Sequence, residues 1–262
     1  VQYVIEEAEA AGLRQVLFIT GKNKRAIEDY FDKDVELITR LTRAGKDELA
    51  DELNALDFDC SFFYVRQSVQ AGLADAIAQS GDFVDGQPFV VALGDSTIKS
   101  PRPGEVLARM KRTFIDKNAA AVIAVQTVAP ENAHKYGIVS TGDEVAEGVF
   151  EVTGLVEKPP AGKAPSNLAV CARYVFAPEI FDAIGRTLPD HRGELQITDS
   201  MKLLLKEGRP VYCVRLADDE RRYDIGNFES YFKAFVDFAL DDEQYGYTLR
   251  QHLYRTLEGG ES

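Results

Sequence analysis

The sequence contains no tryptophan, two methionines and three histidines in 262 residues, and its three cysteines are widely spaced. The cysteines are Cys60, Cys171 and Cys213. Each lies in an apolar segment and none forms a C-x-x-C pair, so we predict neither a disulfide framework nor a zinc knuckle. The histidines have no spacing typical of a metal site or a catalytic triad. Any chemistry must therefore come from other side chains.

Long apolar runs and an excess of positive charge are also lacking. No stretch approaches the roughly 20 apolar residues that cross a bilayer, and no secretory leader opens the chain. We therefore expect a soluble, cytoplasmic protein without a membrane partner. The formal net charge of -13 argues against a nucleic-acid partner, because phosphate neutralisation needs clustered Lys and Arg. An anionic substrate would need local help from a divalent cation, placed basic side chains or a helix N-terminus.

The first half of the chain alternates helical and strand patterns. The predicted strands are 14–20, 60–67, 88–95 and 119–128, and the predicted helices are 1–12, 23–32, 71–81 and 106–117, with a charged helical stretch at 33–56. Gly12 and Gly81 are expected to end their helices. Such alternation predicts an α/β fold with a Rossmann-like, mixed but mainly parallel sheet flanked by helices.

After residue 130 the pattern changes. Antiparallel strands are expected at 136–141, 149–159 and 167–177, short helices at 178–185 and 198–208, one strand at 210–216, and helices from 227 onward. The sequence has no internal repeat and no low-complexity linker. We therefore predict a single domain, 1–262, in which 227–262 form a helical tail.

The apolar run PFVVALGDSTI stops abruptly at Gly94 and Asp95. In open α/β sheets, ligands bind beyond the carboxyl ends of the strands, and Asp95 follows such an end. Gly94 would let a ligand approach the backbone, and the carboxylate would suit Mg²⁺. A plain Gly-Asp turn is the alternative. A second carboxylate, Asp224, follows a short extended stretch in RRYDIGNF.

The segment LVEKPP places Glu157 and Lys158 at a strand end that two prolines terminate. Neighbouring strand side chains point to opposite faces, so both can serve one ligand only if the backbone twists or ends there. An ordinary solvated ion pair is the equally weighted alternative.

These segments, together with YVRQ, YGIV, APSNLA and GELQITD, occur in an order and spacing that resemble the bacterial UTP-glucose-1-phosphate uridylyltransferases. The resemblance covers nearly the whole chain and extends to the sugar-nucleotide pyrophosphorylase superfamily. It implies that UTP and glucose-1-phosphate react to give UDP-glucose and pyrophosphate, by Mg²⁺-assisted in-line attack on the α-phosphate.

The resemblance also implies site residues. Asp95 and Asp224 match the two metal-holding aspartates, and Lys158 would neutralise the sugar phosphate. The implied substrate-binding residues are Gln67 and Gly72 at the uracil, Gly94 beside the metal ligand, and Gly137, Glu157 and Asn167 at the sugar.

Three features depart from the family pattern. The G-x-G-T-R loop and its following lysine do not occur before the first helix, which starts near Val1, so we expect an upstream segment with the first strand and an impaired enzyme without it. Ser96 stands where the family often has a second aspartate, and Phe228 where it has a lysine. These departures keep alternatives open: thymidylyl or another nucleotidyl transfer, a non-catalytic sugar-nucleotide-binding subunit, or, with less support, a glycosyltransferase.

The helical tail carries more apolar side chains than a lone tail needs. The resemblance suggests that they form a homo-oligomer interface, and packing within the chain is the alternative.

Overall fold

A computed structural model describes residues 1–54 and 58–258. Its strands are β1 (Gln15–Thr20), β2 (Ser61–Arg66), β3 (Phe89–Ala92), β4 (Ser96–Lys99), β5 (Ala121–Thr127), β6 (Gly137–Ala146), β7 (Val149–Glu157), β8 (Leu168–Phe176), β9 (Val211–Arg215) and β10 (Arg221–Asp224). Every strand expected from the sequence is present within a few residues. Strand β10 is the short extended stretch expected before Asp224, and β4 is additional.

The helices also follow the predicted segments closely. They are α1 (Gln2–Ala10), α2 (Arg25–Phe31), α3 (Val35–Arg43), α4 (Asp47–Asn54), α5 (Leu73–Ala78), α6 (Gly81–Val84), α7 (Glu105–Asp116), α8 (Ile180–Gly185), α9 (Ile197–Lys206), α10 (Phe228–Leu240) and α11 (Gly246–Glu258). A 3₁₀ turn covers Pro130–Lys135. Among the described residues no helix combines the length and apolarity needed to cross a bilayer.

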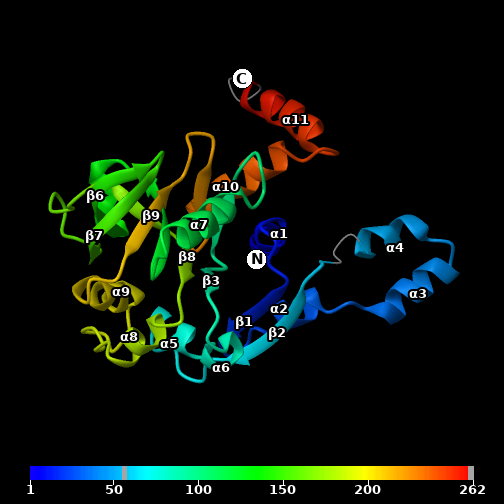
Figure 1. Cartoon of the computed structure of the whole chain (residues 1–262). Helices are drawn as coiled ribbons and strands as arrows, with labels where there is room; N and C mark the ends of the chain where they lie inside the picture. Colours follow the sequence, from blue (N-terminus) through cyan, green and yellow to red (C-terminus); the bar gives the residue numbers. More distant parts are fainter. Residues whose placement is uncertain (55–57, 259–262) are drawn as a thin grey trace.

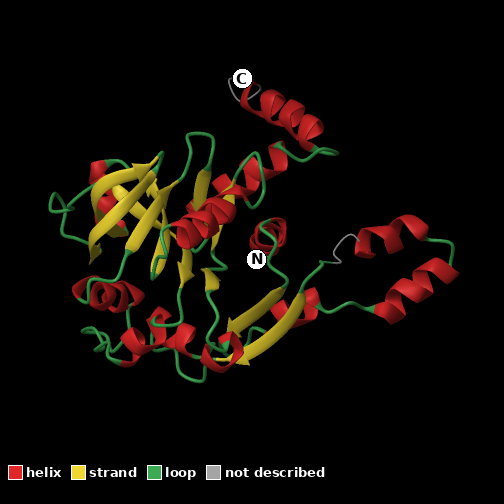
Figure 2. Cartoon of the chain, viewed as in Figure 1, coloured by secondary structure: helices red, strands yellow, loops and turns green. Residues whose placement is uncertain are grey.

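Six strands form the central sheet in the order β3-β8-β5-β9-β7-β6 (Figures 1 and 2). Strand β6 also contacts β8 at Ile138 and Ala169, so the sheet curls on itself. Strands β1 and β2 form a separate parallel pair, and β4 and β10 form a separate antiparallel pair. Helices α3 and α4 project away from the rest of the chain (Figure 1).

The mixed α/β class is confirmed, but parallel pairing is less extensive than we predicted. Among the described strands, the parallel neighbours are β1 with β2 and β5 with β9. Strand β8 lies between β3 and β5 and runs antiparallel to both. The helical crossover from β3 to β5 is therefore present, but the two strands that it joins are not direct neighbours.

Both faces of the sheet are covered, as the apolar strands predict. Alternate residues of β5 face opposite cores: Ile123 and Val125 pack toward α5, α8 and α9, whereas Val122 and Ala124 pack toward α7. All four are fully buried. Packing on both faces fixes the strands whose ends carry the candidate site.

One predicted helix boundary is wrong. The helix expected over 71–81 ends at Ala78, and Gly81 begins α6, so Gly81 is not a C-cap. Gly12 does follow the end of α1 with a φ of +79°. The charged stretch forms two helices, α3 and α4, and Leu56 lies outside the described residues, as do residues 259–262 of the predicted tail.

Candidate active site

A pocket of about 270 Å³ lies where β7, β8, β10 and the segment after β3 meet. Five of the nine residues singled out from the sequence line it. They are Asp95, Gly137, Glu157, Lys158 and Asp224. They come from segments that are remote in sequence, so the fold gathers them.

Asp95 and Asp224 are brought together by the β4–β10 pair. Asp224 lies opposite Ser96 in that ladder, and the Ile225 amide donates to the Asp95 carbonyl over 2.8 Å. A Cβ placed on Gly226 would be 3.1 Å from Asp224 Oδ1 and 3.8 Å from Asp95 Oδ2. Both carboxylates therefore lie next to Gly226, and a side chain there would crowd Asp224.

Arg173 fixes the turn that carries Asp95. Its Nη2 donates to the Ser96 carbonyl over 2.8 Å, and its Nη1 donates to the carbonyls of Leu93 and Ala172 over 3.4 and 3.1 Å. Its Nε and Nη2 also donate to Glu7 Oε2 over 3.0 and 2.8 Å. Arg173 is completely buried. One guanidinium thus ties α1 to both ends of the turn around Asp95.

A bulge in β8 aims Arg173 at this turn. The β5–β8 register shifts between Ile123 and Val125, and Ala172 adopts a left-handed φ of +57°. Bulges re-aim side chains and occur often beside active sites. The Ala172 carbonyl accepts from Leu93 N over 3.2 Å, which joins the bulge to the turn.

Glu157 and Lys158 both reach the pocket because β7 ends between them. Lys158 has a left-handed φ of +43°, and its amide donates to the Tyr136 carbonyl over 3.1 Å. This reversal turns two side chains that would alternate on a strand toward one space. Gly137 lies opposite Glu157 in the β6–β7 ladder, and a Cβ there would be 3.0 Å from Glu157 Oε2.

The electrostatics of the pocket are mixed. Burial raises the pKa of Glu157, and the neighbouring Lys158 opposes that rise. Lys135, Lys158 and Arg222 contribute three basic side chains to the lining. These cations give the local help that a protein of net charge -13 needs to accept an anionic substrate.

Gln67 and Gly72 lie beside this pocket and not on its lining. Gln67 Nε2 donates to Asp75 Oδ2 over 2.6 Å and approaches the Gly72 carbonyl at 3.4 Å. Gly72 has a φ of +100°, and a Cβ there would lie 2.5 Å from the Leu195 carbonyl oxygen. The next residue, Leu73, lines the pocket.

The other two predicted residues are less central. Gly94 is exposed next to Asp95, and a Cβ on it would contact Val1 Cγ2 at 3.6 Å. Asn167 is exposed before β8, where its carbonyl accepts from Val128 N, and it does not line the pocket.

Comparison with known proteins identifies the family of the chain. The family model described as nucleotidyl transferase matches residues 1–240. The chain belongs to the nucleotidyl transferase family.

This nucleotidyl transferase is similar to several proteins named for UDP-glucose synthesis. It is 36% identical over 260 residues to the UTP-glucose-1-phosphate uridylyltransferase of Bacillus subtilis, covering 99% of this chain and 85% of that protein. A UDP-glucose pyrophosphorylase crystallised with UDP-glucose has a TM-score of 0.80 and 33% identity, over 92% of this chain and 86% of that one. A UTP-bound enzyme of Acinetobacter baumannii has a TM-score of 0.87 and 31% identity, over 97% and 86%. The resemblance drawn from the motifs is confirmed.

Sequence reasoning missed Arg222 and Arg173. Arg222 lines the pocket of this nucleotidyl transferase, lies 3.3 Å from Asp224 Oδ2 and donates through Nε to Ser96 Oγ over 2.7 Å. A signal for Arg222 existed, because it precedes Asp224 by two residues and so shares its strand face. For Arg173 the local sequence gave no such signal, because its partner Glu7 lies 166 residues away in the chain.

The donor set suits a hard divalent cation. Two carboxylates flank the space beside Gly226, and magnesium is often held by one or two carboxylates with water and substrate phosphates as its other ligands. Among the described residues no group of three or more His, Cys, Asp or Glu side chains could hold a metal. A cation in this nucleotidyl transferase would therefore depend on substrate oxygens to complete its coordination.

Proposed function

We propose that this chain forms UDP-glucose and pyrophosphate from UTP and glucose-1-phosphate. A phosphate oxygen of glucose-1-phosphate forms a bond to the α-phosphorus of UTP. The bond from that phosphorus to the bridging oxygen of the β-phosphate breaks in line, and pyrophosphate leaves with the electron pair. The protein contributes positioning and charge neutralisation, with no protein nucleophile.

The observation that carries this proposal is the convergence on one pocket of Asp95 and Asp224 with Glu157 and Lys158. A carboxylate pair, an adjacent ammonium and a half-buried hydrogen-bond acceptor are the groups that two phosphorylated substrates and a sugar require. The relatives named for UDP-glucose synthesis support the same substrates for this chain.

We assign Asp95 and Asp224 to Mg²⁺, with Gly226 keeping the space between them open. Bound there, the cation would neutralise phosphate charge that develops during transfer. Lys158 would pair with the sugar phosphate as a charge-assisted donor. Glu157 would accept hydrogen bonds from the sugar hydroxyls, while Gly137 would bring its backbone close to the same ring.

The nucleotide would lie toward α5. Gln67 is held in place by Asp75, and Gly72 supplies a flat backbone surface beside Leu73. Both features suit a pyrimidine base that is recognised by an amide edge and packed against backbone. Gly94 would give the phosphates access to the turn, and Asn167 would contact the sugar from the pocket edge.

The direct test adds the upstream segment that the family pattern predicts and measures pyrophosphate release from UTP and glucose-1-phosphate in Mg²⁺ by this completed parent chain, with UDP-glucose binding measured by calorimetry. Asp95→Asn and Lys158→Ala should each lower turnover by about 100-fold or more, because each removes an electrostatic contact to reacting phosphate. Asp143→Asn and Lys163→Ala are matched controls at exposed positions outside the pocket, and should leave turnover unchanged.

Two outcomes would reject the proposal. Turnover within a few-fold of the parent in Asp95→Asn and Lys158→Ala would show that the assigned roles are wrong. Tight UDP-glucose binding by the parent without turnover would favour a non-catalytic sugar-nucleotide-binding subunit. Competition between UTP and dTTP separates uridylyl from thymidylyl transfer.

The predictions of one domain, a cytoplasmic location and a homo-oligomer belong to this proposal. Helix α10 supports an oligomer, because Phe228, Phe232 and Phe235 on it are 80%, 60% and 60% exposed. Aromatic side chains in such a cluster favour burial against a partner. Light scattering should give an oligomeric mass that Phe232→Ser with Phe235→Ser converts to that of a monomer, and a monomeric parent would contradict this assignment.

A further inference from the structure

Arg222 lines the candidate active site beside one of the two proposed metal ligands. Its Nε donates to Ser96 Oγ over 2.7 Å, and its Nη2 lies 3.3 Å from Asp224 Oδ2. The guanidinium carbon is 5.7 Å from the centre of the Tyr136 ring, a distance at which an aromatic face attracts a cation. The Arg222 side chain is 9% exposed, whereas that of Asp224 is 42% exposed. A firmly held positive charge therefore lies beside an open carboxylate.

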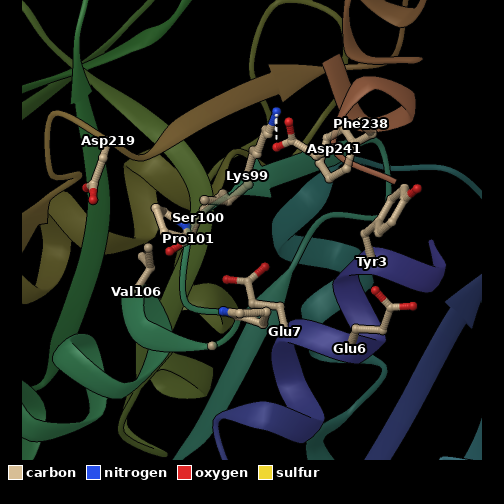
Figure 3. Close-up of a pocket in the computed structure, with 13 residues that line it drawn as sticks. Tyr3, Glu6, Glu7, Lys99, Ser100, Pro101, Val106, Asp219, Phe238 and Asp241 are labelled. Atoms are coloured by element: carbon tan, nitrogen blue, oxygen red, sulfur yellow. Dashed lines mark ion pairs between the residues drawn. The ribbon is translucent and has the colours of Figure 1, made fainter. Parts of the chain in front are cut away.

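The contact between Arg222 and Asp224 is longer than a tight ion pair. A tight pair is found at the larger cavity, of about 490 Å³, between α1, the segment from β4 to α7, and α10, where Lys99 Nζ lies 2.6 Å from Asp241 Oδ2 (Figure 3). Charge-assisted hydrogen bonds are usually about 2.7–2.9 Å long, so a contact of 3.3 Å engages Asp224 only weakly.

Asp224 keeps acceptor positions for a cation. Its Oδ1 accepts from Gly226 N over 3.1 Å, and its Oδ2 accepts from Arg222 Nη2 over 3.3 Å. An ionised carboxylate offers about four acceptor positions, so these two contacts do not fill it. A cation held by Asp95 and Asp224 would thus bind a carboxylate that also contacts a guanidinium, and the two positive charges would repel each other.

The charged groups of the pocket balance without a cation. Among the described residues, three carboxylates and three basic side chains line it. They are Asp95, Glu157 and Asp224, and Lys135, Lys158 and Arg222. A divalent cation that enters alone leaves the ionised lining with an excess of positive charge, whereas a phosphorylated substrate supplies the compensating negative charge. The lining therefore favours a cation that binds together with phosphate.

We propose that Arg222 is a positioning residue that lowers the affinity of the substrate-free site for a divalent cation, so that the cation binds together with substrate phosphate. This role rests on the proposed function, in which Asp95 and Asp224 hold Mg²⁺. Without substrate the guanidinium keeps its contact with Asp224 and repels the cation. Phosphate oxygens relieve the repulsion, because they can accept from a guanidinium and coordinate a cation. Ser96 contributes, because its uncharged hydroxyl holds Arg222 without neutralising it.

The test measures Mn²⁺ binding to the completed parent chain without substrate, by calorimetry and by the electron paramagnetic resonance signal of the free ion. Mn²⁺ prefers the same oxygen ligands as Mg²⁺. Arg222→Gln keeps a donor for Ser96 and removes the charge, so it should bind Mn²⁺ about 10-fold more tightly than the parent. Arg222→Met should do the same and replaces the glutamine variant if that variant misfolds. Arg222→Lys keeps the charge and should bind within about 3-fold of the parent.

Arg221→Met is the matched control. Arg221 precedes Arg222 in β10, points to the other face of the strand, and has a side chain that is 67% exposed. It removes the same charge at a screened position, so Mn²⁺ affinity should stay within about 2-fold of the parent. Asp224→Asn should weaken Mn²⁺ binding by at least about 10-fold, because it removes a charged ligand.

Substrate should change the comparison. Saturating UDP-glucose should tighten Mn²⁺ binding by a larger factor in the parent than in Arg222→Gln, because its diphosphate compensates a positive charge that the variant lacks. By linkage, Mn²⁺ should tighten UDP-glucose binding by the same larger factor in the parent.

The sign of the change decides the role of Arg222. Mn²⁺ affinity in Arg222→Gln equal to or below that of the parent would overturn the proposal, because removing an arginine that only supports the site should weaken binding. Tightening as large in Arg222→Lys or Arg221→Met, or an equal effect of UDP-glucose on the parent and Arg222→Gln, would also overturn it. An Asp224→Asn variant that binds Mn²⁺ like the parent would instead reject the metal assignment in the proposed function. The comparison without substrate is independent of whether the chain makes UDP-glucose.

Discussion

The strongest prediction concerns the buried ion pair of Arg173 and Glu7. We expect Arg173→Met to lower the free energy of unfolding by about 3–5 kcal/mol, because it leaves the Glu7 carboxylate buried without its partner. It also removes the donor to the carbonyls of Leu93, Ala172 and Ser96. Domains are typically stable by about 5–15 kcal/mol, so the loss is a large part of the total.

Glu7→Gln should cost less, about 1–3 kcal/mol, because Arg173 keeps its three carbonyl acceptors and the glutamine oxygen can still accept. In the double variant the methionine no longer leaves a charge behind. We therefore expect its cost to be at least about 2 kcal/mol smaller than the sum of the two single costs.

The assay is urea unfolding of the parent, both single variants and the double variant at pH 7. Arg186→Met offers a control, since Arg186 lies 2.5 Å from Glu207 at the surface, where solvent screens an ion pair and its loss should change stability little. A loss below about 1 kcal/mol in Arg173→Met, or additive single effects in the double variant, would refute the reasoning.

Three further predictions concern the candidate active site. Gly226→Ala should raise the Mg²⁺ concentration needed for half-maximal turnover several-fold, because the new Cβ would be 3.1 Å from Asp224 Oδ1; an unchanged requirement would separate Gly226 from the metal. Gly72→Ala should destabilise the chain by at least about 1–2 kcal/mol in urea, since φ is +100° and the Cβ would meet the Leu195 backbone at 2.5 Å; parent-like stability would contradict the close approach. UDP-glucose affinity should rise as pH increases above 4.5 through the raised pKa of Glu157, because only the ionised carboxylate accepts from two hydroxyls. Glu157→Gln should flatten this profile in calorimetry, and a profile unchanged by that variant would exclude Glu157. The same raised pKa means that Glu157 contributes stability at low pH, which is lost as pH rises through its folded value.

The sequence predicted the elements of this fold better than their neighbours in space. Apolar runs such as 119–128 and 167–177 identify β5 and β8, since buried strands carry apolar residues on both faces. Their pairing was not predictable, because β8 enters between β3 and β5 from far along the chain. The local pattern also gave no sign of β4, whose four residues pair with β10.

The same contrast holds for the candidate site, where residues in motifs were predicted and the residues that position them were not. Motif resemblance identified Asp95, Glu157, Lys158 and Asp224, and all four line one pocket. The bulge at Ala172 was not predicted, because alanine rarely adopts a left-handed φ and the strand pattern around it is regular. Without that bulge the position of Arg173 could not be inferred.

The geometry of the two aspartates depends on residues to which the sequence analysis assigned no role in the site. The β4–β10 ladder sets Asp224 opposite Ser96, and Arg173 holds the Ser96 carbonyl from within the core. Arg222 adds a second tie, because it donates to Ser96 Oγ while lying 3.3 Å from Asp224. Ser96 thus accepts from both arginines, at a position next to Asp95 in the chain and opposite Asp224 in the ladder. An aspartate there would place a further buried charge between two arginines, so the serine at this position changes the support of the site while Asp95 and Asp224 remain on the pocket.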